Sequence, residues 1–168
     1  MGMLINGKWK SGSVVTSDKD GSYARIPRSF LDVISLEDSV FQPESKRYHL
    51  YVSYACPWAH RTLIYRKLKG LEEHISVSVV HPDMLMDGWI FDDRYPEATK
   101  DYLFNARFLR EIYQKADPQI TTSVTVPVLW DTKTNTIVNN ESSEIIRIFN
   151  SSFNGLTGND NDYYPEDK

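Results

Sequence analysis

The sequence is short of cysteine: Cys56 is the only one among 168 residues, so no disulfide can form within the chain. We therefore expect a reducing, cytoplasmic compartment. No stretch approaches the roughly 20 apolar residues of a membrane-spanning helix or the charged-then-apolar pattern of a signal peptide. Basic residues number 19 against 23 acidic ones, a net charge of −4. This balance favours neither a nucleic-acid partner nor an anionic membrane.

Length and composition predict one domain with an appendage, because 168 residues that are 40% hydrophobic can form one well-buried core. Residues 1–47 mix glycines with scattered apolar residues and sustain no period, so we expect an irregular N-terminal extension. Residues 48–153 carry the periodic segments and form the predicted domain. Residues 154–168 are rich in Gly, Asn and Asp, which predicts a linker.

The periodic segments alternate between strand-like and helix-like patterns. In chain order we expect a strand at 48–54, a helix at 58–69, a strand at 75–80, a helix at 101–115, strands at 124–131 and 136–139, and a helix at 141–150. The first two strands should be parallel, since a helix connects them, and the last two should form a hairpin. This order, βαβ-α-ββα, predicts an α/β fold with a thioredoxin-like mixed sheet.

Cys56 lies between the first strand and the first helix, with Pro57 at the first helical position. Unpaired amides and the helix dipole favour a thiolate there, and His60 and Arg61 would add positive charge. Position 59, where two-cysteine redox proteins carry a resolving thiol, is Ala59. A mixed disulfide on Cys56 must therefore be resolved by an external thiol, which in most cytosols is glutathione. The alternative is a buried, inert thiol.

Two further patterns suit a peptide-like ligand. Pro127 interrupts a strand-like run, so it belongs at a bulge, an edge or a cis bond that exposes the backbone of Val126. Glu141 and Ser142 stand at a helix start, where a hydroxyl and free amides can hold a carboxylate and an acidic side chain can hold an ammonium group. The alternatives are an ordinary edge-strand proline and a plain helix cap.

A metal site is not expected, because the four histidines lack paired ligand spacing around Cys56. Together, three motifs resemble those of the Xi-class glutathione transferases, the glutathionyl-hydroquinone reductases, over about residues 24–168. The motifs are Cys56-Pro57-Trp58-Ala59-His60-Arg61, Thr125-Val126-Pro127-Val128-Leu129-Trp130-Asp131 and Ile137-Val138-Asn139-Asn140-Glu141-Ser142-Ser143-Glu144-Ile145. The segment Asp87-Gly88-Trp89 also resembles that family's aromatic loop over the glutathione site.

The resemblance implies an enzyme that uses glutathione as co-substrate and acts on quinone-type or disulfide small molecules. Cys56 would be catalytic, taking glutathione from a glutathionyl-hydroquinone or a mixed disulfide, and a second glutathione would release it as oxidised glutathione. The residues implied in glutathione binding are Trp89, Val126, Pro127, Glu141 and Ser142.

The sequence departs from that family in two ways. Ser123 stands where the family usually has arginine, so a lower affinity for glutathione is expected. The chain also stops at a segment resembling the interdomain linker, so we expect the family's helical domain to be missing. An apolar face would then be exposed and favour a homodimer or other self-association. The alternative function is a non-catalytic thioredoxin-fold module that binds glutathione or a protein partner.

Overall fold

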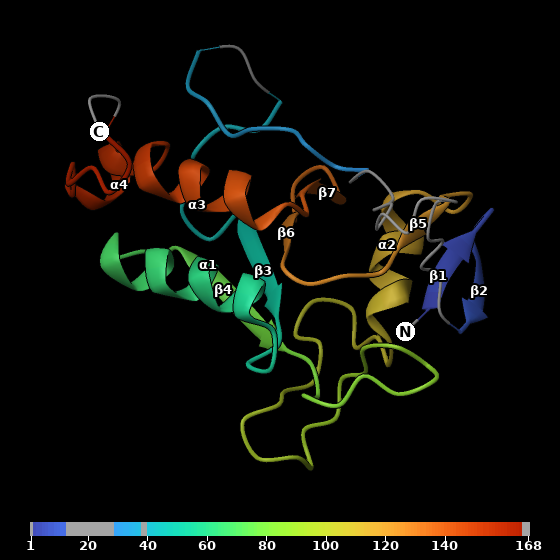
Figure 1. Ribbon diagram of the computed structural model, residues 1–168. Helices are drawn as coiled ribbons and strands as arrows, with labels where there is room; N and C mark the ends of the chain where they lie inside the picture. Colours follow the sequence, from blue (N-terminus) through green and yellow to red (C-terminus); the bar gives the residue numbers. More distant parts are fainter. Residues whose placement is uncertain (1, 13–28, 38–39, 166–168) are drawn as a thin grey trace, which may run out of the picture.

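The computed structural model describes residues 2–12, 29–37 and 40–165 (Figure 1). Its strands are β1 Gly2–Ile5, β2 Lys8–Ser11, β3 Tyr48–Val52, β4 Ile75–Val79, β5 Thr122–Ser123, β6 Val128–Asp131 and β7 Thr136–Asn139. Its helices are α1 Pro57–Leu68, α2 Leu109–Ala116, α3 Ser142–Ser151 and α4 Asn154–Thr157. Residues 13–28 of the predicted extension and 166–168 of the predicted linker lie outside the described residues.

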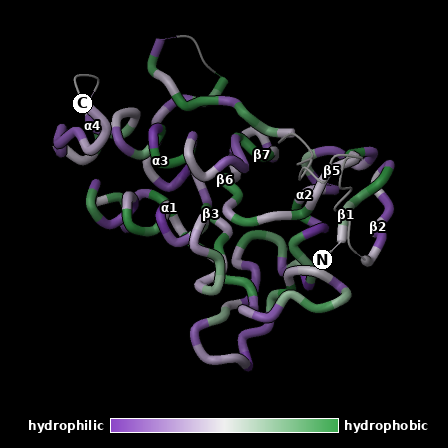
Figure 2. Tube along the Cα trace, viewed as in Figure 1, coloured by the Kyte–Doolittle hydropathy of each residue, from purple (hydrophilic) through white to green (hydrophobic). Residues whose placement is uncertain are grey.

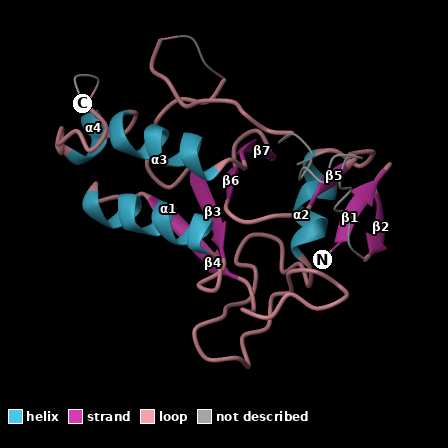
Figure 3. Cartoon of the chain, viewed as in Figure 1, coloured by secondary structure: helices cyan, strands magenta, loops and turns pink. Residues whose placement is uncertain are grey.

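The central sheet has four strands in the order β4-β3-β6-β7. The β3 and β4 strands are parallel, whereas β6 is antiparallel to both β3 and β7. The predicted thioredoxin-like mixed sheet is therefore confirmed. Helices α1 and α3 pack together on one side of this sheet, and α2 lies on the other (Figure 3).

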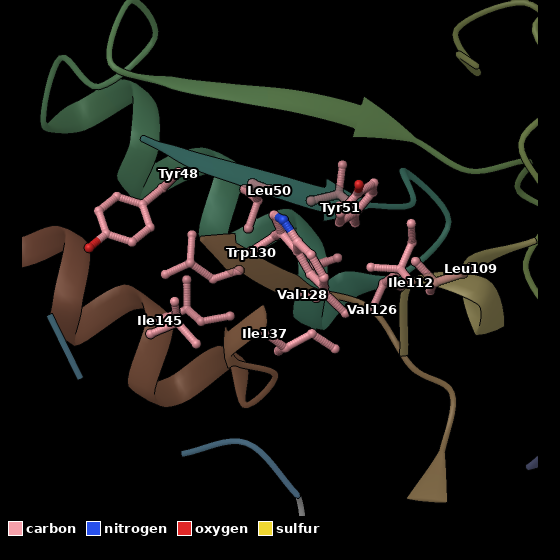
Figure 4. Packing of buried hydrophobic residues seen from close by; sticks show 14 of the residues in the cluster. Tyr48, Leu50, Tyr51, Leu109, Ile112, Val126, Val128, Trp130, Ile137 and Ile145 are labelled. Atoms are coloured by element: carbon pink, nitrogen blue, oxygen red, sulfur yellow. The ribbon is translucent and has the colours of Figure 1, made fainter. Parts of the chain in front are cut away.

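All five residues of β3 are buried, because the sheet is covered on both faces. Successive side chains point to opposite faces. The Tyr48 ring meets Phe153, just beyond α3, whereas the Tyr51 ring meets Phe91 in the long segment between β4 and α2. Figure 4 shows Tyr48 beside α3, which contributes Ile145 to the same cluster. Cys56 and α1 therefore follow a strand, β3, that is buried on both faces.

The helix predicted at 101–115 is shorter in the structure, where α2 begins only at Leu109. The buried Asp101 carboxylate explains the difference. Its two oxygens accept hydrogen bonds from the amides of Leu103, Phe104 and Ala106, at 3.0 Å each. These contacts hold the backbone in turns instead of a helix, as Asp side chains commonly do.

The described part of the N-terminal extension contains a hairpin that was not predicted from the sequence. The β1 and β2 strands are joined by Asn6 and Gly7, both with positive φ, which is typical of a tight hairpin turn. A Cβ at Gly7 would lie 1.9 Å from the Pro118 carbonyl oxygen, so only glycine fits. The β1 strand also pairs with β5, which fixes the hairpin to the domain.

The domain also carries exposed apolar side chains. Trp58, Ile64 and Leu68 of α1 are between 42% and 52% exposed, and hydrophobic stretches recur along this helix in Figure 2. Such a face suits a packing partner.

His49 is a buried histidine of the central strand β3. Its Nδ1 and Nε2 atoms lie 2.6 Å and 2.8 Å from the hydroxyls of Ser76 and Ser78. Burial lowers the pKa of His49 to about 4, from an ordinary value of 6.5, although Asp101 partly opposes this. The neutral ring therefore stabilises the fold above pH 6.5, and this stability is lost as the pH falls towards 4.

We predict that acidification from pH 7 to pH 4.5 lowers the free energy of unfolding less in a His49→Gln variant than in the parent chain. Glutamine can form hydrogen bonds to both serines and does not titrate. Protonation of His49, by contrast, lowers the free energy of unfolding by up to about 3 kcal/mol. Urea unfolding at a series of pH values measures the difference. Equal pH dependence in the two proteins would contradict the assignment.

Candidate functional site

The pairing of β3 with β6 places the first two predicted motifs together. The register puts Tyr51 opposite Val128. The end of β3, from which the chain continues to Cys56, therefore lies next to the start of β6, which the chain enters from Pro127. The Val126-Pro127 peptide bond is cis, one of the alternatives expected from the sequence. The Cys56 Sγ atom lies 3.8 Å from the Val126 carbonyl oxygen, within hydrogen-bond reach for sulfur.

Cys56 is the N-cap residue of α1, and Pro57 follows as the first helical residue. The Cys56 amide donates to the Ser53 carbonyl at 3.1 Å, and its own carbonyl accepts from the His60 amide at 2.9 Å. The backbone is thereby fixed while the side chain makes no capping bond to the helix. Cys56 is half-buried, so the alternative of a fully buried cysteine does not hold.

The third predicted motif lies where α3 begins. Glu141 is the N-cap, and its carboxylate accepts a hydrogen bond from the Ser143 amide at 3.2 Å. The buried Ser142 is the first helical residue, and its hydroxyl accepts from Arg61 Nε at 3.1 Å and Nη2 at 2.6 Å. The same Nη2 atom lies 3.8 Å from Glu141 Oε1.

Arg61 therefore connects α1, whose N-cap is Cys56, with α3, whose first residue is Ser142. Its guanidinium also lies 5.2 Å from the centre of the Trp58 ring, a cation–π contact. From the sequence, Arg61 is predicted only to add positive charge near the Cys56 thiol. Its contact with Ser142 was not predicted, because the two residues lie far apart in the chain. The sequence offered one signal for it: the predicted domain contains both an arginine and an acidic helix start.

Trp89 is placed by a different set of contacts. It is half-buried in the segment between β4 and α2, and its carbonyl accepts from the Leu109 amide at the start of α2 at 3.0 Å. Among the described residues, no hydrogen bond or ring contact links Trp89 to Cys56. The structure thus groups Cys56, Val126 and Pro127 and joins Glu141 to Ser142 through Arg61. Within the described part of the chain, no hydrogen bond or ring contact links Trp89 to either group.

The N-terminal hairpin supports the loop that precedes Trp89. Trp9 of β2 donates from Nε1 to the Met86 carbonyl at 3.3 Å, and its ring would lie 2.8 Å from a Cβ at Gly88, which has a φ of +75°. The Arg110 guanidinium lies 5.0 Å from the centre of the Trp9 ring and donates to the Asp87 carbonyl. The loop is therefore held from β2 and from α2.

Ser123, the position where the resembled family usually has arginine, belongs to β5 and pairs with Met3. In the described ranges no group of three His, Cys, Asp or Glu residues could hold a metal ion. The described helices also include none long and apolar enough to span a membrane.

Comparison with known proteins identifies relatives of this chain. A family model described as "Glutathione S-transferase, N-terminal domain" matches residues 55–152. The glutathionyl-hydroquinone reductase YqjG of Escherichia coli is 51% identical over 172 residues, which cover 98% of this chain and 52% of that protein. The "glutathione S-transferase omega-like 2" of Schizosaccharomyces pombe is 59% identical over 138 residues, covering 82% of this chain and 44% of that protein.

Solved structures give the same picture. The Xi-class enzyme from Natrialba magadii superimposes with a TM-score of 0.86 at 47% identity, over 99% of this chain and 49% of that one. The glutathione-bound structure of YqjG gives a TM-score of 0.82 at 48% identity, over 98% and 50% of the two chains. This chain thus spans about half the length of the relatives it matches.

We predict that iodoacetamide adds one carbamidomethyl group to the native chain, on Cys56, and does so faster at pH 7 than to the same chain in concentrated urea. The amides at the start of a helix attract negative charge, and unfolding removes this arrangement. Mass spectrometry over a time course measures both rates. Slower modification of the native chain would indicate a shielded thiol.

Proposed function

Because this chain belongs to the glutathione S-transferase family, as an N-terminal domain of the Xi class, we propose that it carries a glutathione-dependent, monothiol oxidoreductase activity. The reaction removes glutathione from glutathionyl-hydroquinones or from mixed disulfides. The observation that carries the proposal is the half-exposed Cys56 thiol at the start of α1, beside the Val126 carbonyl. The relatives named as glutathionyl-hydroquinone reductases support the choice of substrate class.

In the first step the Cys56 thiolate attacks the sulfur of the bound glutathionyl group. A disulfide forms between Cys56 and glutathione while the bond from that sulfur to the ring carbon breaks. The electron pair of the broken bond stays on the carbon, which takes up a proton to give the hydroquinone. With a mixed disulfide as substrate, the leaving group is the other thiolate.

In the second step a further glutathione thiolate attacks the disulfide on Cys56. Oxidised glutathione leaves, and the Cys56 thiolate is restored. The two electrons that reduce the carbon–sulfur bond thus come from two glutathione sulfurs. Since Cys56 is the only cysteine in the sequence, no thiol within the chain can take the place of the second glutathione.

Glutathione would bind along the path from Cys56 to the start of α3. The Val126 backbone, turned by the cis bond before Pro127, pairs with the cysteinyl part of the peptide. The γ-glutamyl carboxylate meets the Ser142 hydroxyl and the first amides of α3, and its ammonium group meets the Glu141 carboxylate. Arg61 orients Ser142 and Glu141, and Trp89 contributes an aromatic surface at the rim.

Two properties of the whole protein are further parts of the proposal. We place the chain in the cytoplasm, where glutathione keeps a lone cysteine reduced. We also assign the exposed Trp58, Ile64 and Leu68 face of α1 to contact with further protein, either a helical domain or a second copy of the chain. The alternative function is a module that binds glutathione without turnover.

We predict that oxidised glutathione adds one glutathionyl group to the chain and that added glutathione then removes it. A Cys56→Ser variant should acquire no adduct, since no other thiol is present. Intact-protein mass spectrometry follows both reactions. Glutathione binding without adduct formation would favour the binding-module alternative over catalysis.

We also predict that Ser142→Ala weakens glutathione binding about tenfold, because a hydrogen bond to a charged group is lost. The matched control is Ser151→Ala at the exposed far end of α3, where the hydroxyl bonds only the Arg147 carbonyl. Titration calorimetry compares the two variants with the parent chain. Equal affinities in all three would remove Ser142 from the site.

A further inference from the structure

Tyr113 lies in α2 and is fully buried, yet its hydroxyl contacts both segments of the proposed glutathione site. It donates to the Thr125 carbonyl at 2.9 Å and accepts from the Thr125 amide at 3.3 Å. It also accepts from Asn140 Nδ2 at 3.2 Å. Thr125 directly precedes Val126, and Asn140 directly precedes Glu141.

From these contacts we propose that Tyr113 is a positioning residue that sets the spacing between the Val126-Pro127 bend and the start of α3. The inference rests on the proposed function, because that spacing matters only if one ligand spans both segments. Neither Tyr113 nor Asn140 touches the ligand in this scheme. Both act through the residues that follow Thr125 and Asn140 in the chain.

The hydroxyl suits this role because a phenol can both donate and accept hydrogen bonds, so one group contacts the backbone of Thr125 and the side chain of Asn140. Asn140 Oδ1 is buried without a hydrogen-bond partner among the described residues, so the Tyr113 hydroxyl is the contact that orients this side chain. A buried donor or acceptor that loses its partner must move or remain unsatisfied.

The position of Cys56 depends on other contacts. Its backbone is fixed by Ser53 and His60 at the end of β3 and the start of α1. Losing the Tyr113 hydroxyl should therefore weaken ligand binding while leaving the reactivity of the free thiol unchanged. A purely structural role would instead lower stability without separating these two properties.

The decisive comparison is Tyr113→Phe against Tyr48→Phe. Tyr48 is 1% exposed and its hydroxyl donates to the Gln42 carbonyl at 2.7 Å, so both substitutions remove one buried hydroxyl that donates to a backbone carbonyl. Only the first lies between the two segments. We expect Tyr113→Phe to raise the dissociation constant for glutathione about tenfold. Tyr48→Phe should leave it unchanged while also lowering thermal stability, and both variants should keep the parent rate of Cys56 alkylation.

A second pair keeps the test valid if Tyr113→Phe does not fold. Asn140→Ala removes only the contact to the start of α3, and its control is Asn150→Ala, whose side chain bonds Asp162 near the other end of the helix. Asn140→Ala should weaken glutathione binding and Asn150→Ala should not. In the double variant, Asn140→Ala should raise the dissociation constant for glutathione by a smaller factor than it does alone. Both substitutions remove the same hydrogen bond between Tyr113 and Asn140.

The outcomes separate the inference from the function on which it rests. If the parent chain neither binds glutathione nor forms the Cys56 adduct, the proposed function fails and the inference fails with it. If the parent chain does both, but the Tyr113 and Asn140 variants bind glutathione as tightly as their controls, only the positioning role is overturned. Weaker binding confined to the Tyr113 and Asn140 variants supports it.

Discussion

The antiparallel pairing of β6 with β3 is the constraint on which the site depends. The strand that ends before Cys56 and the strand that follows Pro127 share one register, from Tyr48 opposite Asp131 to Tyr51 opposite Val128. A shift of that register by one residue would turn every side chain of β6 to the other face of the sheet. Since both faces are covered, the core itself fixes the register and so fixes the approach of the Val126 carbonyl to the thiol.

Helices α1 and α3 add the electrostatic part of the arrangement. Each has a residue of the site as its N-cap, Cys56 in one case and Glu141 in the other, and the positive end of the helix dipole favours negative charge at both starts. Arg61 is the side chain that reaches from one start to the other. A thiolate and a carboxylate of one ligand would thus face two helix dipoles connected by one guanidinium group.

The parts that could be predicted from the sequence are those that local chemistry decides. Pro57 marks the start of α1, β-branched runs mark β4 and the β6–β7 hairpin, and the proline after Val126 marks a bend. The unpredicted parts depend on partners far along the chain. Asp101 delays the start of α2, and the contact of Arg61 with Ser142 needs the packed helices. Asn6-Gly7 is a local signal for the β1–β2 hairpin. It was not used, because residues 1–47 taken together show no sustained strand or helix period.

The way the hairpin is attached also constrains how the protein can be made. Leu4 pairs with Thr122, and the Gly7 amide donates to the Ile120 carbonyl, so β1 is synthesised well over 100 residues before these partners exist. Until then the apolar β1 strand has an unpaired edge, a surface that chaperones bind and that promotes aggregation. The loop before Trp89 therefore takes its final support from the β1–β2 hairpin only after residues 120–123 have been synthesised.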